Sequence, residues 1–274
     1  MSKVGLALSS GGARGIAHVG ILSILERECI PIDMIAGTSI GAIIGAFYAA
    51  GKTSQEIGDV ILSIDRRKMY SFFDFTLSSQ GIIRGAKVSE WLTSIIGNLT
   101  FDDLKMPFAC VAADIMTGEK VVVSKGSVVD GIMSSISIPI LYMPFRLQGR
   151  YLVDGGLVDP VPVDVVREMG ADLTIAATVA SDIGKKLKRV ITNGLVHPNA
   201  PNIFSIIRRL MKVANSEETI TGAASADIII TPAVQGRRLR PGDRRRISEL
   251  ISSGEQSAIH AIPTIKSQLK MWGL

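Results

Sequence analysis

Cysteine is scarce in this chain of 274 residues, which has only Cys29 and Cys110. Neither lies at metal-ligand spacing from another cysteine or from a histidine, so the sequence lends no support to a zinc site. Two distant thiols also do not make a disulfide framework. We therefore expect a reduced, cytoplasmic setting and no metal.

Aromatic residues are also few, at 5% of the chain, which is too sparse for a surface that stacks bases. Nucleic acid is therefore not an expected partner. The formal net charge of +5 is modest. It favours anionic partners without identifying one.

Long hydrophobic runs are missing as well. The apolar run 4–8 is too short for the core of a signal peptide. The uncharged stretch 34–51 carries Gly37, Gly41 and Gly45 at four-residue spacing, which resembles a membrane helix-packing face. A strand, a sharp turn and a buried helix produce the same pattern, and we favour this second interpretation because the turn holds a serine.

The pattern that is present is an alternation of short apolar strands with amphipathic helices, which predicts an α/β fold with a mostly parallel sheet. Stretch 66–98 is less regular, carries an aromatic patch and is a candidate cap over a site. We expect one domain over residues 1–274, with an excursion that caps the site or faces a membrane at about 183–220. The expected strands are 4–8, 32–36, 107–113, 120–123, 142–147, 150–153, 173–179 and 228–231, and the expected helices are 15–28, 40–50, 54–64 (with Ser54 as N-cap), 88–96, 127–135, 162–169, 203–224 and 247–269.

The first motif, Gly37–Gly41, reads G-x-S-x-G between an expected strand and an expected helix. A serine at such a turn is held in a strained backbone with its hydroxyl projecting outward, and the two glycines let the flanking elements approach closely. The start of the helix offers the amide of Ile40 to a developing oxyanion. Ser39 is therefore a candidate nucleophile.

The second motif, 10–15, is a glycine-rich loop after the first strand, where backbone amides can face an anion. Ser10 occupies the first glycine position of a dinucleotide fingerprint, and no Gly-Lys-Ser/Thr of a phosphate loop is present. The loop is therefore either an oxyanion hole or a plain tight turn.

The third motif, Asp154–Gly156, follows an expected strand. Ligand and catalytic residues of α/β sheets commonly lie at strand ends, but an Asp-Gly pair also makes an ordinary turn.

The three motifs together resemble the patatin-like phospholipase family over residues 3–178, with a weaker echo at 226–232. The resemblance implies a three-layer α/β/α fold, with Ser39 as nucleophile and Asp154 as general base. It places the oxyanion hole at Gly11, Gly12, Ala13, Arg14 and Ile40, and the glycines that shape the site at Gly37, Gly41, Gly155 and Gly156. Further echoes are His18, Gly20, Asp114, Thr117, Gly118, 135–139 and 160–162.

The implied activity is serine esterase chemistry on lipid acyl esters, of phospholipase A, lysophospholipase or esterase type, through an acyl-serine intermediate. The resemblance implies no metal and no cofactor. An acyltransferase that uses the same acyl-enzyme, and a lipid-binding regulator without turnover, remain alternatives.

Two residues depart from the family pattern. Ser10 stands where another glycine is common, and Ile140 follows Pro139 where a glycine is more usual. We expect Ile140 to shape the acyl pocket.

A histidine could turn the pair into a triad, because His197 and His260 both follow Asp154 in the chain. Neither follows an expected strand, so the dyad is favoured, and His18 is expected to be a packing residue. The basic runs 185–189, 208–212 and 237–246 and the amphipathic stretch 203–213 are either solvated surface and buried packing or a peripheral contact with an anionic membrane.

Overall fold

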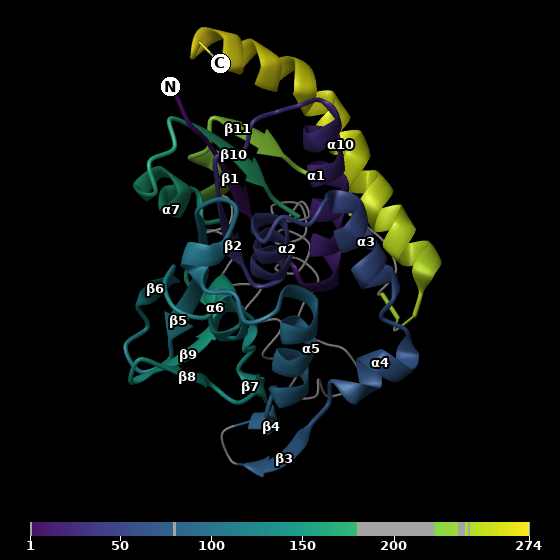
Figure 1. The fold of residues 1–274 in the computed structure, drawn as a ribbon, viewed down its shortest axis with the longest axis vertical. Helices are drawn as coiled ribbons and strands as arrows, with labels where there is room; N and C mark the ends of the chain where they lie inside the picture. The colour runs from purple at the N-terminus through teal and green to yellow at the C-terminus, as the bar shows by residue number, and fades with distance from the viewer. Residues whose placement is uncertain (1, 79–80, 180–221, 235–238, 241, 274) are drawn as a thin grey trace, which may run out of the picture.

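The central element is an eight-stranded sheet with the order β11-β10-β1-β2-β5-β9-β8, in which β6 also pairs with β5 (Figure 1). The computed structural model describes residues 2–78, 81–179, 222–234, 239–240 and 242–273. The strands from β11 to β5 are parallel to one another, whereas β6, β8 and β9 run antiparallel to their neighbours. The bounds are β1 (Val4–Leu8), β2 (Met34–Thr38), β5 (Phe108–Asp114), β6 (Lys120–Val123), β8 (Phe145–Leu147), β9 (Arg150–Asp154), β10 (Leu173–Ala177) and β11 (Ile228–Ile230).

Helices cover both faces of this sheet, so the expected three-layer α/β/α arrangement is confirmed. Side chains alternate along each strand: Leu6 and Leu8 point into the larger core, and Ala7 points into the smaller one. The larger core is built with α1 (Ala17–Arg27), α2 (Ile40–Ala49), α5 (Ala86–Ile96) and α6 (Val128–Ile136). The smaller core is closed by α7 (Val163–Glu168), which packs against alanines of four neighbouring strands.

The terminal helix α10 (Arg244–Met271) lies along the outside of α1 (Figure 1). Two glycines allow the close approach. A Cβ on Gly20 would lie 1.9 Å from the carbonyl oxygen of Ile251, and one on Gly254 would lie 1.9 Å from that of Ala17. Backbone contact on both sides therefore fixes where the helices cross.

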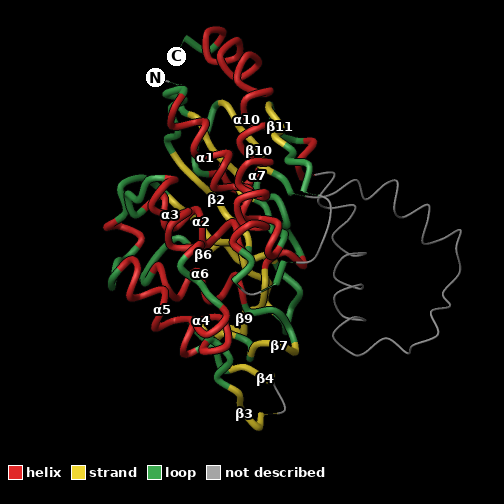
Figure 2. Tube along the Cα trace, turned by 90° about the vertical axis from the view of Figure 1, so that its right-hand side faces the viewer, coloured by secondary structure: helices red, strands yellow, loops and turns green. Residues whose placement is uncertain are grey.

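A second, three-stranded sheet lies at the end of the molecule opposite to both termini (Figures 1 and 2). It consists of β3 (Phe75–Ser78), β4 (Gly81–Ile83) and β7 (Ile140–Tyr142), and α4 (Arg66–Ser71) precedes it in the chain. The expectation of one strand over 142–147 was wrong, because Tyr142 belongs to β7 and the main sheet begins again only at Phe145.

Several element boundaries differ from the expected ones. Helix 15–28 is divided into the 3₁₀ helix η1 (Gly12–Ile16) and α1, because the glycine-rich loop winds more tightly. Helix α3 (Ser54–Leu62) is capped by Thr53, which forms a capping box with Glu56, and not by Ser54.

The turn between β8 and β9 was expected and is confirmed. Gln148 and Gly149 have φ values of 48° and 81°, the positive pair that a two-residue type I′ hairpin requires. The uncharged stretch 34–51 is β2 followed by α2, as the second interpretation of its glycines predicted. Among the described residues, no helix is both long and apolar enough to cross a membrane.

Candidate active site

Ser39 occupies the turn between β2 and α2, with its backbone at φ 56° and ψ −120°. This left-handed φ is uncommon for a residue with a side chain, and such strain is concentrated at functional sites. Its Oγ donates a hydrogen bond to Oδ2 of Asp154 over 2.6 Å. Ser39 is buried, with 8% of its surface exposed.

Close packing explains why glycines flank this serine. A Cβ on Gly37 would lie 2.4 Å from the carbonyl oxygen of Gly41, and a Cβ on Gly41 would lie 2.2 Å from the carbonyl oxygen of Leu8. Strand and helix therefore meet backbone to backbone, which a larger residue at either position would prevent.

Asp154 ends β9 and is 4% exposed. Its Oδ2 accepts from Ser39, and its Oδ1 accepts from the amide of Gly156 over 2.8 Å. Gly155 lies against β5, where a Cβ would come within 2.1 Å of the carbonyl oxygen of Val111. The two glycines thus turn the chain immediately after the carboxylate and satisfy one of its oxygens.

Burial raises the pKa of Asp154 to about 6, and the hydrogen bonds from Ser39 and Gly156 oppose that rise. The carboxylate is therefore a stronger base than an exposed aspartate and is still mainly ionised at neutral pH. A carboxylate of this kind can accept a proton from a hydroxyl that it already contacts.

Ser135, near the end of α6, forms a hydrogen bond to the backbone of the strained turn at Ser39. Its Oγ accepts a hydrogen bond from the amide of Ser39 over 2.9 Å and donates one to the carbonyl oxygen of Val111 over 2.6 Å. In the next turn of the chain, the carbonyl oxygen of Ser137 accepts from the amide of Asp154 over 2.9 Å. Sequence reasoning noticed 135–139 only as part of the family resemblance and missed this contact, because nothing local in the sequence shows what a serine 96 positions away will bind.

The glycine-rich loop lies beside this pair. Gly15 is packed against Ile40, since a Cβ there would lie 2.1 Å from a methyl group of that side chain, and Gly156 faces Ser10. Gly12 has a φ of 56° and begins η1, whose first amides have no acceptor within the helix. Within the described part of the chain, no hydrogen bond from the amides of Gly11 or Ile40 is found.

Arg14 and His18 support the loop from inside. Arg14 is half-buried, its Nε approaches the carbonyl oxygen of Gly11 at 3.5 Å, and burial lowers its pKa. His18 is fully buried, with Nε2 3.0 Å from the carbonyl oxygen of Ser9, and burial lowers its pKa to about 4. The imidazole is therefore neutral at pH 7 and acts as the hydrogen-bonded packing residue that its position on the helix predicted.

Ile140 has a φ of 70°, a backbone conformation that strongly disfavours a β-branched residue. A glycine would adopt it without cost. Ile140 lies three residues after Ser137, whose carbonyl oxygen accepts from the amide of Asp154. The turn around it is closed by a hydrogen bond from the amide of Tyr142 to the carbonyl oxygen of Ile138.

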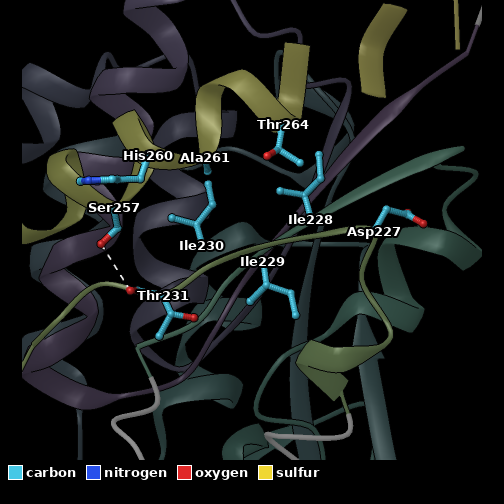
Figure 3. A pocket seen from close by; sticks show the side chains of 9 residues that line it. All are labelled: Asp227, Ile228, Ile229, Ile230, Thr231, Ser257, His260, Ala261 and Thr264. Atoms are coloured by element: carbon cyan, nitrogen blue, oxygen red, sulfur yellow. Dashed lines mark hydrogen bonds between the residues drawn. The ribbon is translucent and has the colours of Figure 1, made fainter. Parts of the chain in front are cut away.

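The structure does not bring His260 to Ser39. It lies on α10 and lines a hollow of about 470 Å³ between this helix and β11, together with Ile230, Ser257 and Thr264 (Figure 3). Neither Ser39 nor Asp154 lines this hollow. His197 lies outside the described residues, as do the expected excursion at 183–220, the basic runs 185–189 and 208–212, and the amphipathic stretch 203–213.

In the described part of the chain, no three His, Cys, Asp or Glu side chains lie close enough together to hold a metal ion. The candidate site thus consists of a serine hydroxyl, a buried carboxylate and a loop of backbone amides.

Comparison with known families and proteins gives a consistent result. The profile of the patatin-like phospholipase family matches residues 6–167, which include all three motifs. An NTE family protein of Mycobacterium tuberculosis is 37% identical over 177 residues, which is 65% of this chain and 49% of that protein. The lysophospholipase NTE1 of Scheffersomyces stipitis is 33% identical over 228 residues, covering 77% of this chain and 15% of that protein. The chain thus spans about half the length of the mycobacterial relative and far less of the fungal one.

Two solved structures share the fold. VipD from Legionella pneumophila superposes with a TM-score of 0.65 at 14% identity, covering 96% of this chain and 67% of that one. The type III effector protein ExoU superposes with a TM-score of 0.50 at 12% identity, covering 96% of this chain and 53% of that one. At these identities the likeness concerns the fold alone.

Proposed function

The chain belongs to the patatin-like phospholipase family, and from this premise we propose that it is a serine hydrolase that cleaves acyl esters of lipids through a Ser39–Asp154 dyad. The observation that carries the proposal is the 2.6 Å hydrogen bond between Ser39 Oγ and Asp154 Oδ2 at a strained turn between strand and helix.

In the first half of the reaction, Ser39 Oγ attacks the ester carbonyl while its proton moves to Asp154 Oδ2. The negative charge that develops on the carbonyl oxygen faces the amides of the glycine-rich loop, Gly11 to Arg14, and the amide of Ile40. The C–O bond to the alcohol then breaks, and the leaving oxygen takes the proton from Asp154. An acyl ester on Ser39 remains.

In the second half, a water molecule takes the place of the alcohol. Asp154 accepts a proton from the water as it attacks the acyl group, and the same amides face the oxyanion. Collapse of this intermediate releases the fatty acid and returns the proton to Ser39 Oγ. The elevated pKa of Asp154 suits both directions of proton transfer near neutral pH.

The fungal relatives carry the name lysophospholipase, which supports a lipid with a single acyl chain as the first substrate to assay. Ile140, at the strained position near the site, is the residue to which we assign a part in acyl-chain preference.

The test compares wild type with Ser39→Ala on soluble esters of increasing acyl length and on a lysophospholipid. We expect the wild type to release fatty acid and Ser39→Ala to lose at least about a thousandfold in kcat. Wild-type turnover by Ser39→Ala would overturn the proposal. Transfer of the acyl group to an added alcohol in preference to water would replace the hydrolase with an acyltransferase.

A further inference from the structure

The small sheet and the helix before it form a distinct surface of the molecule. We call the part made of α4, β3, β4 and β7 the distal lobe, because it lies at the end opposite to both termini in two perpendicular views (Figures 1 and 2). Apart from Ile140 in β7, to which we assign a part in acyl-chain preference, the function proposed above gives the lobe no role.

The distal lobe exposes aromatic rings that touch one another. Tyr70 is 67% exposed, Phe73 37% and Phe75 74%. The rings of Tyr70 and Phe73 are 6.5 Å apart and those of Phe73 and Phe75 are stacked at 5.9 Å, while Ile82 on β4 adds a further exposed apolar side chain. In a chain with so few aromatic residues, a contiguous exposed group of them marks an interaction surface.

The surroundings of these rings are basic. The two acidic side chains nearest in sequence accept hydrogen bonds from backbone amides. Asp65 caps α4 by accepting from the amide of Lys68, and Asp74 accepts from the amides of Gly85 and Ala86. The same segment exposes the basic side chains of Arg67, Lys68, Arg84 and Lys87. Lys87 pairs with Glu90, and Lys68 Nζ lies 5.8 Å from the centre of the Phe72 ring, so this cation already stands beside an aromatic ring of the segment. Exposed aromatic rings among basic side chains are the composition that binds the interface of an anionic membrane.

The distal lobe is also tied to the candidate active site. The chain that follows α6 contains β7, which pairs with β4, and Met143, whose amide donates to the carbonyl oxygen of Ile83. These two contacts join the rest of the lobe to that stretch of chain. The carbonyl oxygen of Ser137, at the start of that segment, accepts from the amide of Asp154, and Ser135, in the last turn of α6, accepts from the amide of Ser39. A surface bound by the lobe therefore lies within a few residues of the structure that supports both catalytic candidates.

We propose that the distal lobe docks the protein on an anionic phospholipid membrane, with Tyr70, Phe73 and Phe75 inserted at the level of the head groups and the basic side chains facing the anionic lipids. The inference rests on the proposed function, because a lipid hydrolase must meet its substrate at such a surface. It locates that contact in 66–87, whereas the sequence alone directed attention to the basic runs beyond 183.

The experiment measures co-sedimentation with vesicles in a Ser39→Ala background, so that no lipid is consumed. The parent, Phe73→Ser with Phe75→Ser, and Arg67→Gln with Lys68→Gln are mixed with vesicles of phosphatidylcholine alone and of equimolar phosphatidylcholine and phosphatidylglycerol. The matched control, Met271→Ser with Trp272→Ser, removes exposed apolar side chains at the opposite end of the molecule. Thermal unfolding of each variant verifies that it is folded.

We expect the parent to prefer the anionic vesicles and the control to bind like the parent. The aromatic variant loses about tenfold or more in affinity, because two large apolar side chains no longer enter the interface. The charge variant loses about fivefold for each charge removed, and the loss is smaller at high salt.

Equal binding by the parent and the aromatic variant, no preference for anionic vesicles, or no vesicle binding by the parent would each overturn the proposal. Hydrolysis of a water-soluble ester by the wild type tests the proposed function separately, because that substrate needs no membrane. Vesicle binding through the lobe by a protein without esterase activity would refute the function and not the surface.

Discussion

At the scale of single residues, the site depends on one carboxylate that is kept buried and yet ionised. A buried charge without a full ion-pair partner destabilises a fold, and Asp154 has only a hydroxyl and an amide to compensate it. The residue that we propose as general base is therefore also a cost to stability, and the two effects can be measured together.

Asp154→Asn is expected to abolish turnover and to stabilise the protein. The pKa of Asp154 in the folded protein, about 6, lies above the ordinary value of 3.8, so protonation of this group favours the folded state. Its contribution to the free energy of unfolding is fully present below about pH 4 and is lost as pH rises through 6. The side-chain amide of Asp154→Asn carries no charge at any pH, so at pH 8 the variant should have a free energy of unfolding higher than wild type by on the order of 2 kcal/mol. Denaturant titration and ester hydrolysis of the same samples measure both.

His260→Ala is the control for the dyad, because this residue lines a hollow that contains neither Ser39 nor Asp154. It should keep at least about half of the wild-type kcat, since its imidazole is not on the proton path. Loss of turnover in folded His260→Ala, or wild-type turnover in Asp154→Asn, would contradict the assignment.

The dependence of rate on pH follows from the same group. Because the base must be ionised to accept the proton of Ser39, kcat/KM for a soluble ester should rise with pH and reach half its plateau near pH 6. The profile reports the free enzyme. A half-maximal rate near pH 4 would mean that burial does not raise the pKa of Asp154 as described.

Ser135 provides a test of positioning. In Ser135→Ala the amide of Ser39 loses its acceptor, and the strained turn loses the side chain that fixes it. We expect kcat to fall about tenfold with little change in KM, the effect of one unsatisfied buried donor. Ser134→Ala is the matched control, because this neighbour is equally buried and its hydroxyl only donates to Gly131 within α6, so its kcat should stay within about twofold of wild type. Equal losses in both variants would reduce Ser135 to a structural role.

The sequence identifies some of these residues and not others, for a physical reason. Ser39, Asp154 and their glycines lie in short motifs whose spacing is dictated by a single turn, so local sequence reveals them. Ser135 acts across 96 positions and the strain at Ile140 is a backbone angle, and both depend on tertiary packing. The catalytic role of the pair remains a prediction.

At the scale of secondary structure, the crossing of α1 and α10 shows how little tolerance the packing allows. In Gly254→Ala the added Cβ would lie 1.9 Å from the carbonyl oxygen of Ala17, so the helices must separate. We expect a loss of about 2 to 4 kcal/mol in the free energy of unfolding, as for other overpacked positions. The measurement is chemical denaturation.

Gly58→Ala in α3 is the counterpart, because a Cβ there would meet its nearest neighbour, a methyl group of Val19, at an ordinary 3.6 Å. The substitution removes a flexible residue from a helix and should stabilise the protein by about 0.5 to 1 kcal/mol. Similar effects of the two substitutions would contradict the account of the α1–α10 crossing.

The central strands of the main sheet could be predicted because they are buried on both faces and therefore read as short runs with few polar residues, as in Val4–Leu8 and Phe108–Asp114. The helices that cover the sheet could be predicted from the helical spacing of their apolar residues. The distal lobe could not be predicted in the same way. Its strands are three or four residues long, and β7 joins β4 across more than fifty positions of chain. Strands this short, paired with distant parts of the chain, show no recognisable pattern of apolar residues in the sequence.

At the scale of the whole molecule, the alternation of strands and helices predicted an α/β fold with a mostly parallel sheet, and the family resemblance implied three layers. Neither predicted the order of the strands. That order places β2 next to β5 and β5 next to β9, which brings Ser39 and Asp154 together across 115 positions. The expectation of a single domain with an excursion at about 183–220 remains a prediction, because that stretch lies outside the described residues.

Covalent labelling of the folded protein with a fluorophosphonate, followed by intact-mass measurement and peptide mapping, tests whether Ser39 is a nucleophile activated by Asp154. We expect one adduct per molecule, located on Ser39, absent from Ser39→Ala and formed much more slowly in Asp154→Asn, because the hydroxyl there lacks its base. A protein that hydrolyses esters while Ser39 stays unlabelled, or that carries the label on another residue, would contradict this expectation.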